Sequence, residues 1–368
     1  LISYLLAGKT DRERMKYRPD DFYEKNRCEL IAGVSADHLE PKRKTVVLSD
    51  GRELPYDRLL VAAGSSPAVP PIKGLEAVEN MTTFLSLDDA LRLEEMLTPF
   101  SRVLILGAGL IGLKCAEGIA GKAKSITVVD MADHILPSIL DQEASAPVQR
   151  RLEEHGIEFV LSDAAQELHP DRAVLKSGRG IRFDILVMAV GVRPNVRLVQ
   201  NAGGAVKRGI VTDSRGQTSI PDVYAAGDCT ESRDITTGEE KVLALLPNAY
   251  LQGECAGINM AGGNQSYDKA IPMNSIGFFG LHLMTAGSCG GEAYLEKNGG
   301  NYKKLFVRVN RLAGYILIAD VARAGIYTSL IREQTSLSAL DFELIRQKPQ
   351  LMAFSRTKRN EMLGGNVG

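Results

Sequence analysis

Residues 102–130 leave little freedom for the fold, because an apolar run, a glycine-rich turn, a helical stretch and a second apolar run follow one another directly. The turn reads Gly107-x-Gly109-x-x-Gly112. In such a unit the first glycine permits the tight turn, the second lets the backbone approach a pyrophosphate, and the third lets the helix pack against the strand. The sequence therefore predicts a dinucleotide-binding strand–helix–strand unit rather than three glycines in an ordinary turn.

The second apolar run ends on Asp130, where a carboxylate would accept hydrogen bonds from the two ribose hydroxyls of NAD. Met131-Ala132 follows, so no Arg is at hand to compensate the charge of a 2′-phosphate. We therefore expect NADH to be preferred over NADPH. Leu110 and Ile111 at the helix start, together with Gly191 after a later apolar run, complete the predicted NAD site.

The composition is typical of a globular protein: 44% of the 368 residues are hydrophobic, 24% are charged, and the net charge is −1. This charge favours neither nucleic acid nor an anionic membrane as a partner, and no apolar run approaches the roughly 18 residues of a membrane span. The 5 cysteines are scattered, without a C-x-x-C or a Cys/His cluster. We expect no zinc or iron–sulfur site, no metal, and a reducing cytoplasm as the compartment.

Strand-like and helical stretches alternate around this unit, and residues 86–192 are interpreted as one compact α/β unit. Ser86 is the expected N-cap of its first helix. Elsewhere, short strands are expected at Glu29–Ile31 and Gly209–Thr212, and a helix at Ala339–Arg346.

A second nucleotide signature lies at Gly227-Asp228, where another predicted strand ends. A Gly-Asp pair after a strand is weak evidence alone, because such turns are common. The order along the chain is more specific: Ala62-Ala63-Gly64, then the dinucleotide unit, then Ala189-Val190-Gly191, then Gly227-Asp228.

In this order the motifs resemble the flavoproteins with two dinucleotide-binding domains, the pyridine nucleotide-disulfide oxidoreductase superfamily. Within it the chain is most similar to NADH-dependent nitrite reductase flavoprotein modules, NADH oxidases and rubredoxin reductases. The resemblance implies an α/β fold with two Rossmann-like dinucleotide-binding domains, the FAD domain interrupted by the NAD domain, and a C-terminal α+β interface domain. The implied boundaries are 1–78 for the first FAD part, 79–193 for the NAD domain, 194–267 for the FAD return segment, 268–350 for the interface domain and 351–368 for a tail.

The resemblance also assigns residues to FAD. Asp228 is placed on the ribityl chain, and the helix that begins near Asn248 points its positive end at the pyrimidine ring, which stabilises the anionic reduced flavin. The implied FAD residues are Ala63, Gly64, Gly227, Asp228, Asn248 and Ala249.

The chain departs from the family pattern in its first residues. The family's FAD fingerprint would precede Leu1, so we interpret the sequence as truncated at its N-terminus. The redox cysteine of the disulfide reductases is absent from Leu1–Gly8. Cys115 and Cys229 are interpreted as small buried side chains rather than redox thiols, so disulfide chemistry is not expected.

Two further departures concern the face of the flavin. Lys114 stands where relatives carry a Glu near the nicotinamide, and Tyr4 takes the place of that Glu's Lys partner. Lys114, the candidate catalytic residue, either brings positive charge to the flavin N5 region or is a solvated helix residue. Leu110 replaces a Tyr that covers the flavin in some relatives, which would leave nicotinamide access less restricted.

The resemblance implies a flavoprotein that transfers hydride from NADH to FAD and then electrons to a carrier protein or a small-molecule acceptor. The alternatives are an NADH oxidase that reduces oxygen and, without FAD, a non-enzymatic NAD-binding redox sensor. We also expect a homodimer contact in residues 271–346. The apolar residues behind this expectation are Ile276, Phe278, Phe279, Leu281 and Leu283.

Overall fold

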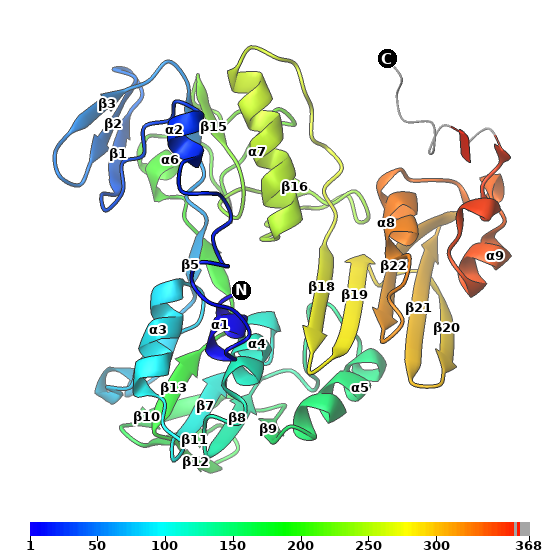
Figure 1. The fold of residues 1–368 in the computed structure, drawn as a ribbon. Coiled ribbons are helices and arrows are strands. Elements are labelled where there is room, and N and C mark those ends of the chain that lie inside the picture. Colours follow the sequence, from blue (N-terminus) through cyan, green and yellow to red (C-terminus); the bar gives the residue numbers. More distant parts are fainter. Residues whose placement is uncertain (357–358, 361–368) are drawn as a thin grey trace. The chain divides into compact units, whose positions relative to one another are not determined.

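The computed structural model describes residues 1–356 and 359–360. The chain forms two compact units, each built from two segments of sequence (Figure 1). Unit 1 consists of residues 1–55 and 65–193, and unit 2 of residues 56–64 and of the chain from residue 194 onward. The finer five-part division given above stays a prediction.

A parallel five-stranded sheet forms the centre of unit 1, with strand order β6-β13-β7-β8-β9. Its three central strands, β13, β7 and β8, are almost uninterrupted runs of buried residues, as expected of a parallel sheet whose two faces are covered. These strands are β6 (Met81–Thr83), β7 (Arg102–Leu106), β8 (Ser125–Val129), β9 (Ile157–Val160) and β13 (Ile185–Met188).

Helices connect the strands of this sheet. They are α3 (Leu87–Met96) before β7, α4 (Leu110–Ile119) between β7 and β8, and α5 (Gln142–Glu153) between β8 and β9. The predicted cap of α3 is confirmed: the Ser86 hydroxyl accepts from the Asp89 N–H, and the Asp89 carboxylate accepts from the Ser86 N–H. This reciprocal pair satisfies two of the donors that a helix start leaves unpaired.

Unit 1 also contains two small antiparallel sheets, and a two-stranded ribbon lies at its end, with its last residue, Pro194, in unit 2. Their elements are β1 (Ala36–Glu40), β2 (Thr45–Leu48) and β3 (Glu53–Pro55), then β10 (Ala165–His169), β11 (Arg172–Leu175) and β12 (Gly180–Arg182), and β5 (Ser65–Pro67) with β14 (Val192–Pro194). The short helical elements are α1 (Ile2–Leu6), α2 (Phe22–Lys25) and η1 (Leu75–Ala77).

In unit 2, β4 (Leu59–Val61) pairs in parallel with β15 (Val223–Ala225), although more than a hundred residues of unit 1 separate them in sequence. The long helix α7 (Leu246–Met260) contacts β15. Three smaller elements accompany them: α6 (Arg197–Asn201), β16 (Ser232–Arg233) and β17 (Glu240–Lys241).

The C-terminal part of unit 2 is an antiparallel sheet with strand order β18-β19-β22-β21-β20. Its strands are β18 (Met273–Phe278), β19 (Leu281–Gly287), β20 (Glu292–Asn298), β21 (Asn301–Arg308) and β22 (Arg311–Ile318). It is followed by α8 (Ala324–Arg332), η2 (Leu337–Ala339), α9 (Phe342–Gln347) and η3 (Leu351–Ala353).

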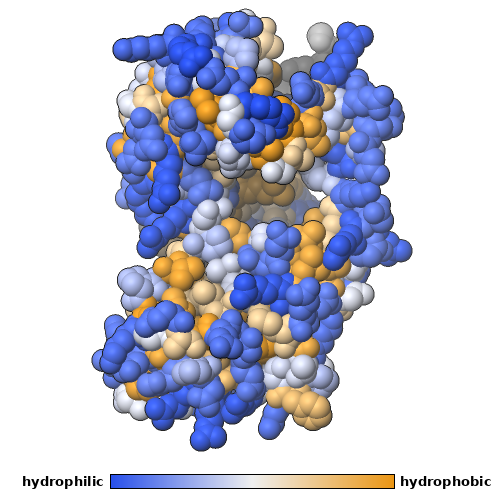
Figure 2. Space-filling view, turned by 90° about the vertical axis from the view of Figure 1, so that its left-hand side faces the viewer, coloured by the Kyte–Doolittle hydropathy of each residue, from blue (hydrophilic) through white to orange (hydrophobic). Residues whose placement is uncertain are grey.

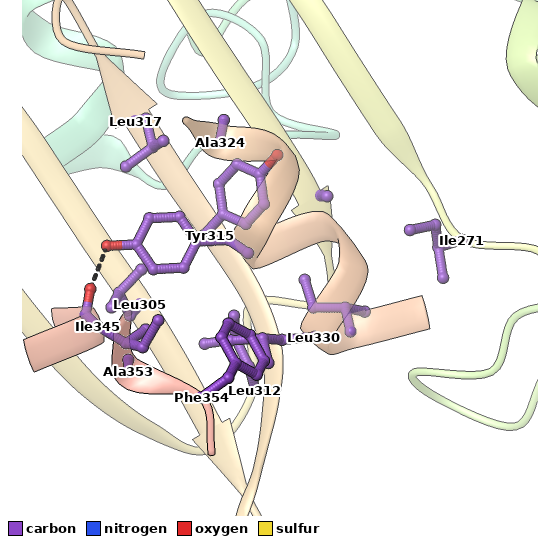
Figure 3. Close-up of a cluster of buried hydrophobic side chains, with 13 residues drawn as sticks. Ile271, Leu305, Leu312, Tyr315, Leu317, Ala324, Leu330, Ile345, Ala353 and Phe354 are labelled. Atoms are coloured by element: carbon purple, nitrogen blue, oxygen red, sulfur yellow. Dashed lines mark hydrogen bonds between the residues drawn. The ribbon is translucent and has the colours of Figure 1, made fainter. Parts of the chain in front are cut away.

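Buried side chains from this sheet and its helices form one hydrophobic cluster (Figure 3). Leu305, Tyr315 and Leu317 come from the strands, and Leu330 and Ile345 from the helices. The dashed line in Figure 3 ends on Ile345, whose backbone carbonyl accepts a hydrogen bond from the buried Tyr327 hydroxyl at 2.8 Å.

Two expected strands are wrong, and one expected helix begins later than predicted. Residues 29–31 form no strand: Leu30 is exposed, and no neighbouring strand pairs with the segment. Residues 209–212 have only isolated bridges at Ile210. The expected helix at 339–346 begins later, at Phe342, because the Asp341 carboxylate accepts from the Leu344 N–H and caps the helix there.

The face drawn in Figure 2 is mostly hydrophilic, with apolar side chains in smaller groups between. Within residues 1–356 and 359–360, no helix has the length and apolar character needed to cross a membrane.

Candidate nucleotide and flavin sites

The glycine turn of unit 1 has the backbone geometry that its sequence predicts. Gly107 has φ +111°, and a Cβ there would lie 2.3 Å from the Ala189 carbonyl oxygen. A Cβ at Gly112 would lie 2.0 Å from the Gly107 carbonyl oxygen, so only glycine lets α4 approach this turn so closely. At Gly109, by contrast, a Cβ would meet no atom within 4 Å. The open side of the turn is therefore at the position where a pyrophosphate would approach.

Helix α4 begins directly after this turn. Gly109 is its N-cap and offers no side chain to the first N–H groups, which belong to Leu110, Ile111 and Gly112. The first intrahelical bond of the helix is donated by Leu113 to the Gly109 carbonyl at 3.0 Å. N–H groups at such a start attract anionic phosphate. Gly191, after β13, has φ +108° and open space beside it.

Asp130 is half-buried and bound to the backbone through both carboxylate oxygens. Oδ2 accepts from the Ala108 N–H at 2.6 Å, and Oδ1 accepts from the Ala132 N–H at 2.8 Å. A carboxylate oxygen accepts more than one hydrogen bond, so each can also accept from a ribose hydroxyl. The acid that was expected to contact the ribose therefore also holds the glycine turn, a second role that its position in the sequence did not reveal.

Lys114 is not a solvated helix residue. Its side chain is only 16% exposed and forms an ion pair with Glu117, one turn further along α4, whose side chain is 6% exposed. The Lys114 ammonium also lies 4.8 Å from the centre of the Tyr4 ring on α1. One of the two alternatives for Lys114 is thus wrong, because α1 packs over this part of α4.

In unit 2, the Ala63-Gly64 and Gly227-Asp228 turns follow the paired strands β4 and β15. Gly64 has φ +64° with no atom within 4 Å of a Cβ, and Gly227 has φ +82°. Asp228 is half-buried. A Cβ at Gly227 would lie 3.6 Å from the Cβ of Ala249, so the Gly-Asp turn is adjacent to the first turn of α7. Positive-φ glycines and an adjacent carboxylate fit the hydroxylated ribityl chain of a flavin.

Gln252 holds the Gly-Asp turn in place. Its Oε1 accepts from the Gly227 N–H at 2.7 Å and from the Thr230 hydroxyl at 3.3 Å. Its Nε2 donates to the Ser232 hydroxyl at 2.5 Å. The role of Gln252 was not predicted from the sequence. The only available signal was its place one helical turn after Asn248 in a helix otherwise rich in small residues.

The Asn248 side chain is buried and engaged at both ends. Its Nδ2 donates to the Ile271 carbonyl at 3.3 Å, and its Oδ1 accepts from the Tyr267 hydroxyl at 2.8 Å. What Asn248 can still offer to a flavin is its backbone N–H, because the first bond within the helix is donated by Ala249 to Leu245.

The interpretation of Cys115 and Cys229 as buried side chains is confirmed. Both are fully buried, and burial raises the pKa of each thiol. All cysteines are free. In the part of the chain that the structure describes, no three His, Cys, Asp or Glu side chains are grouped as metal ligands would be.

Two sequence patterns of known protein families match this chain. The sequence pattern described as pyridine nucleotide-disulphide oxidoreductase matches residues 3–253, and the pattern of the rubredoxin NAD+ reductase C-terminal domain matches residues 272–335. The chain belongs to the pyridine nucleotide-disulphide oxidoreductase family.

Two relatives from this family align with 92% of the chain. The NADH-dependent phenylglyoxylate dehydrogenase subunit epsilon of Aromatoleum evansii is 31% identical over 353 residues, and the alignment covers 83% of that protein. The nitrite reductase [NAD(P)H] of Bacillus subtilis (strain 168) is 29% identical over 349 residues, but the alignment covers 42% of that protein.

Among solved structures, putidaredoxin reductase in its covalent complex with putidaredoxin matches with a TM-score of 0.86. The match covers 99% of this chain and 89% of that one at 21% sequence identity, so it shows the fold. The expected α/β fold with a C-terminal domain and the expected class, an NAD(P)H-dependent FAD oxidoreductase, are confirmed.

Proposed function

We propose that this chain is the electron-input flavoprotein of an NADH-linked redox system, which passes electrons from NADH through FAD to a carrier protein. Asp130 carries the proposal, because its carboxylate lies at the end of β8, held by the Ala108 and Ala132 N–H groups beside the glycine turn. NADH would bind along this turn. The proposed NAD residues are Gly107, Gly109, Leu110, Ile111, Gly112, Asp130 and Gly191.

FAD would bind at the ends of β4 and β15, in unit 2. The proposed residues are Ala63, Gly64, Gly227, Asp228 and Ala249, with Asn248 contributing through its backbone. Bound flavin supplies the hydride acceptor and the stepwise release of electrons. The residues of the chain bind and orient it: the start of α7 favours negative charge, and Gln252 keeps the Gly227-Asp228 turn in one conformation.

Lys114 is the proposed catalytic residue, acting as a paired charge. Its ammonium is shared between the Glu117 carboxylate and the face of Tyr4, so it would contribute an oriented dipole rather than an isolated positive charge. The family pattern has a Glu at position 114. Here the carboxylate belongs to Glu117, one helical turn further along α4.

We propose a carrier protein as acceptor because the C-terminal domain belongs to the rubredoxin reductase type and the cysteines are free, three of them buried. A homodimer through residues 271–346 and a cytoplasmic site of action are further parts of the proposal. Phe278 and Leu283 are buried within the single chain, so the homodimer contact would use the partly exposed Ile276, Phe279 and Leu281.

The test is anaerobic reduction of the full chain after incubation with excess FAD. Bound flavin is expected to lose its visible absorbance on addition of NADH, and to regain it faster with rubredoxin or ferricyanide than with dissolved oxygen. If the visible absorbance of the flavin returned faster with oxygen than with the carrier, the protein would instead be an NADH oxidase. A protein that binds NADH but takes up no flavin would contradict the proposal and support a non-enzymatic sensor.

A further inference from the structure

The segment from Met131 to Leu140, between β8 and α5, supports the glycine turn from behind. Leu136 is fully buried with φ +54°, an unusual conformation for a residue with a side chain. Its N–H donates to the Ala108 carbonyl at 2.9 Å, while the Ala108 N–H donates to Asp130. Both backbone groups of the residue between Gly107 and Gly109 are thus held by the segment 130–136.

His134 connects the middle of this segment to its end at Leu140. Its Nδ1 lies 2.5 Å from the Asp133 carboxylate, and its Nε2 lies 3.1 Å from the Leu140 carbonyl oxygen. Carbonyl oxygens only accept hydrogen bonds, and so do ionised carboxylates. Two such partners are both satisfied only when both ring nitrogens carry a proton, which is the imidazolium form. A neutral ring would turn a lone pair toward one of the two oxygens.

The charges around the ring agree with this geometry. The charged groups facing it are Asp133 on the same segment and Asp141, the N-cap of α5. Partial burial alone would lower the pKa of His134, but the hydrogen bonds to Asp133 and Leu140 and the two negative charges outweigh burial and raise this pKa.

We infer that His134 is a positioning residue for NAD(H): protonated, it closes the segment 131–140 behind the glycine turn, and uncharged, it releases one end of that segment. The inference rests on the proposed binding of NADH at this turn. Release would loosen the Leu136 bond to Ala108 and, with it, the Ala108 bond that orients Asp130. The affinity for the adenosine half of the coenzyme would therefore fall as His134 loses its proton.

The direction of the pH dependence follows from linkage. Because the pKa of His134 is raised in the folded protein, its support is fully present below the ordinary histidine value of about 6.5 and is lost as the pH rises through the raised value. By reciprocity, a bound nucleotide must raise the pKa of His134 further.

The test measures binding of ADP-ribose to the full chain by calorimetry, from about pH 6 to about pH 9, a range on both sides of the ordinary histidine pKa. ADP-ribose lacks the nicotinamide, so the flavin does not affect the result. Wild-type affinity is expected to fall about fivefold across the range, the low end of ordinary coupling between two sites.

Two variants and one control separate the role of His134 from simple packing. His134→Arg keeps a cation with several donors, so the variant should bind ADP-ribose with little pH dependence. His134→Gln lacks the charge, so this variant should bind ADP-ribose weakly and without pH dependence. The control His155→Gln removes a ring whose Nδ1 contacts the Arg151 carbonyl near the end of α5, away from the glycine turn. Its ADP-ribose affinity should show the same pH dependence as that of the wild type.

Since an arginine at this partly buried position can disturb folding, NMR of the wild-type imidazole gives an independent measurement. ADP-ribose should raise the pKa of His134. Affinity that is flat with pH, a pH dependence that persists in the variants, or a pKa that does not move would each overturn the inference. Absence of ADP-ribose binding at every pH would instead overturn the proposed NADH site.

Discussion

Asp130 holds the glycine turn through its carboxylate, and in the proposed NADH site the same carboxylate faces the ribose. The carboxylate accepts two backbone N–H groups, from Ala108 and Ala132, and both oxygens retain capacity for ribose hydroxyls. The negative charge disfavours a 2′-phosphate, and Met131 and Ala132 supply no cation to offset it. In the proposed site, discrimination between the coenzymes and construction of the turn would therefore be coupled at this residue.

We predict that Asp130→Arg shifts the ratio of NADPH to NADH affinity upward by at least about tenfold, roughly 1.4 kcal/mol, because a repelling charge becomes an attracting one. NADH affinity should fall at the same time, since the Ala108 N–H loses its acceptor. Nucleotide titration under low salt measures both effects. Glu158→Arg, an exposed change on β9, is the control for added positive charge. An unchanged ratio would show that Asp130 does not face the ribose.

The site residues that could be predicted from the sequence are those that form a recognisable spacing pattern. Gly107, Gly112 and Asp130 belong to one local pattern whose geometry follows from the turn itself. Gln252 and His134 could not be assigned, because their partners, the Gly227 N–H and the Leu140 carbonyl, are backbone groups that every residue has. Only the folded chain shows which of these groups such a side chain reaches.

Among the elements, α8 and α9 are joined by a buried hydrogen bond from the Tyr327 hydroxyl to the Ile345 carbonyl. We predict that Tyr327→Phe lowers the free energy of unfolding by about 1–3 kcal/mol, since the carbonyl stays buried without a donor. Urea unfolding monitored by circular dichroism measures the change.

Tyr315→Phe is the matched control for this prediction. The Tyr315 hydroxyl contacts the Thr328 hydroxyl, which also donates to the Ala324 carbonyl at 3.2 Å and so keeps a partner. Loss of the Tyr315 hydroxyl should therefore lower the free energy of unfolding by less than loss of the Tyr327 hydroxyl. If both variants lowered the free energy of unfolding equally, the hydrogen bond to Ile345 would not contribute more to stability than the one to Thr328.

Elements were predictable where local pattern and capping agree. The strand–turn–helix around Gly107 and the capped helix α3 are confirmed within a few residues. The predicted strands at 29–31 and 209–212 were wrong because a short segment with strand-favouring residues becomes a strand only if a partner strand pairs along its length. Such a partner is a tertiary feature that propensity does not encode.

For the molecule as a whole, the division into two units has an energetic consequence. The parallel sheet of unit 1 and the antiparallel sheet of unit 2 each have their own hydrophobic cluster. A ligand stabilises the part that it binds, by about 2.7 kcal/mol at a hundred times its Kd.

We therefore predict that ADP-ribose slows amide hydrogen exchange in β7, α4 and β8 much more than in β18–β22, measured by mass spectrometry of the full chain. Equal protection of both sheets would show that the two units unfold as one. No protection in unit 1 would place the nucleotide elsewhere.

The two backbone bonds of Asp130 also bear on how such a chain can evolve. A lineage under selection for the phosphorylated coenzyme cannot simply discard this acid, because the same substitution leaves the Ala108 amide without its anchor. Viable routes would first need a substitute acceptor behind the turn and only then a change of charge. Descendants of this fold should therefore change coenzyme by paired substitutions, and single exchanges at this position should be rare among functional sequences.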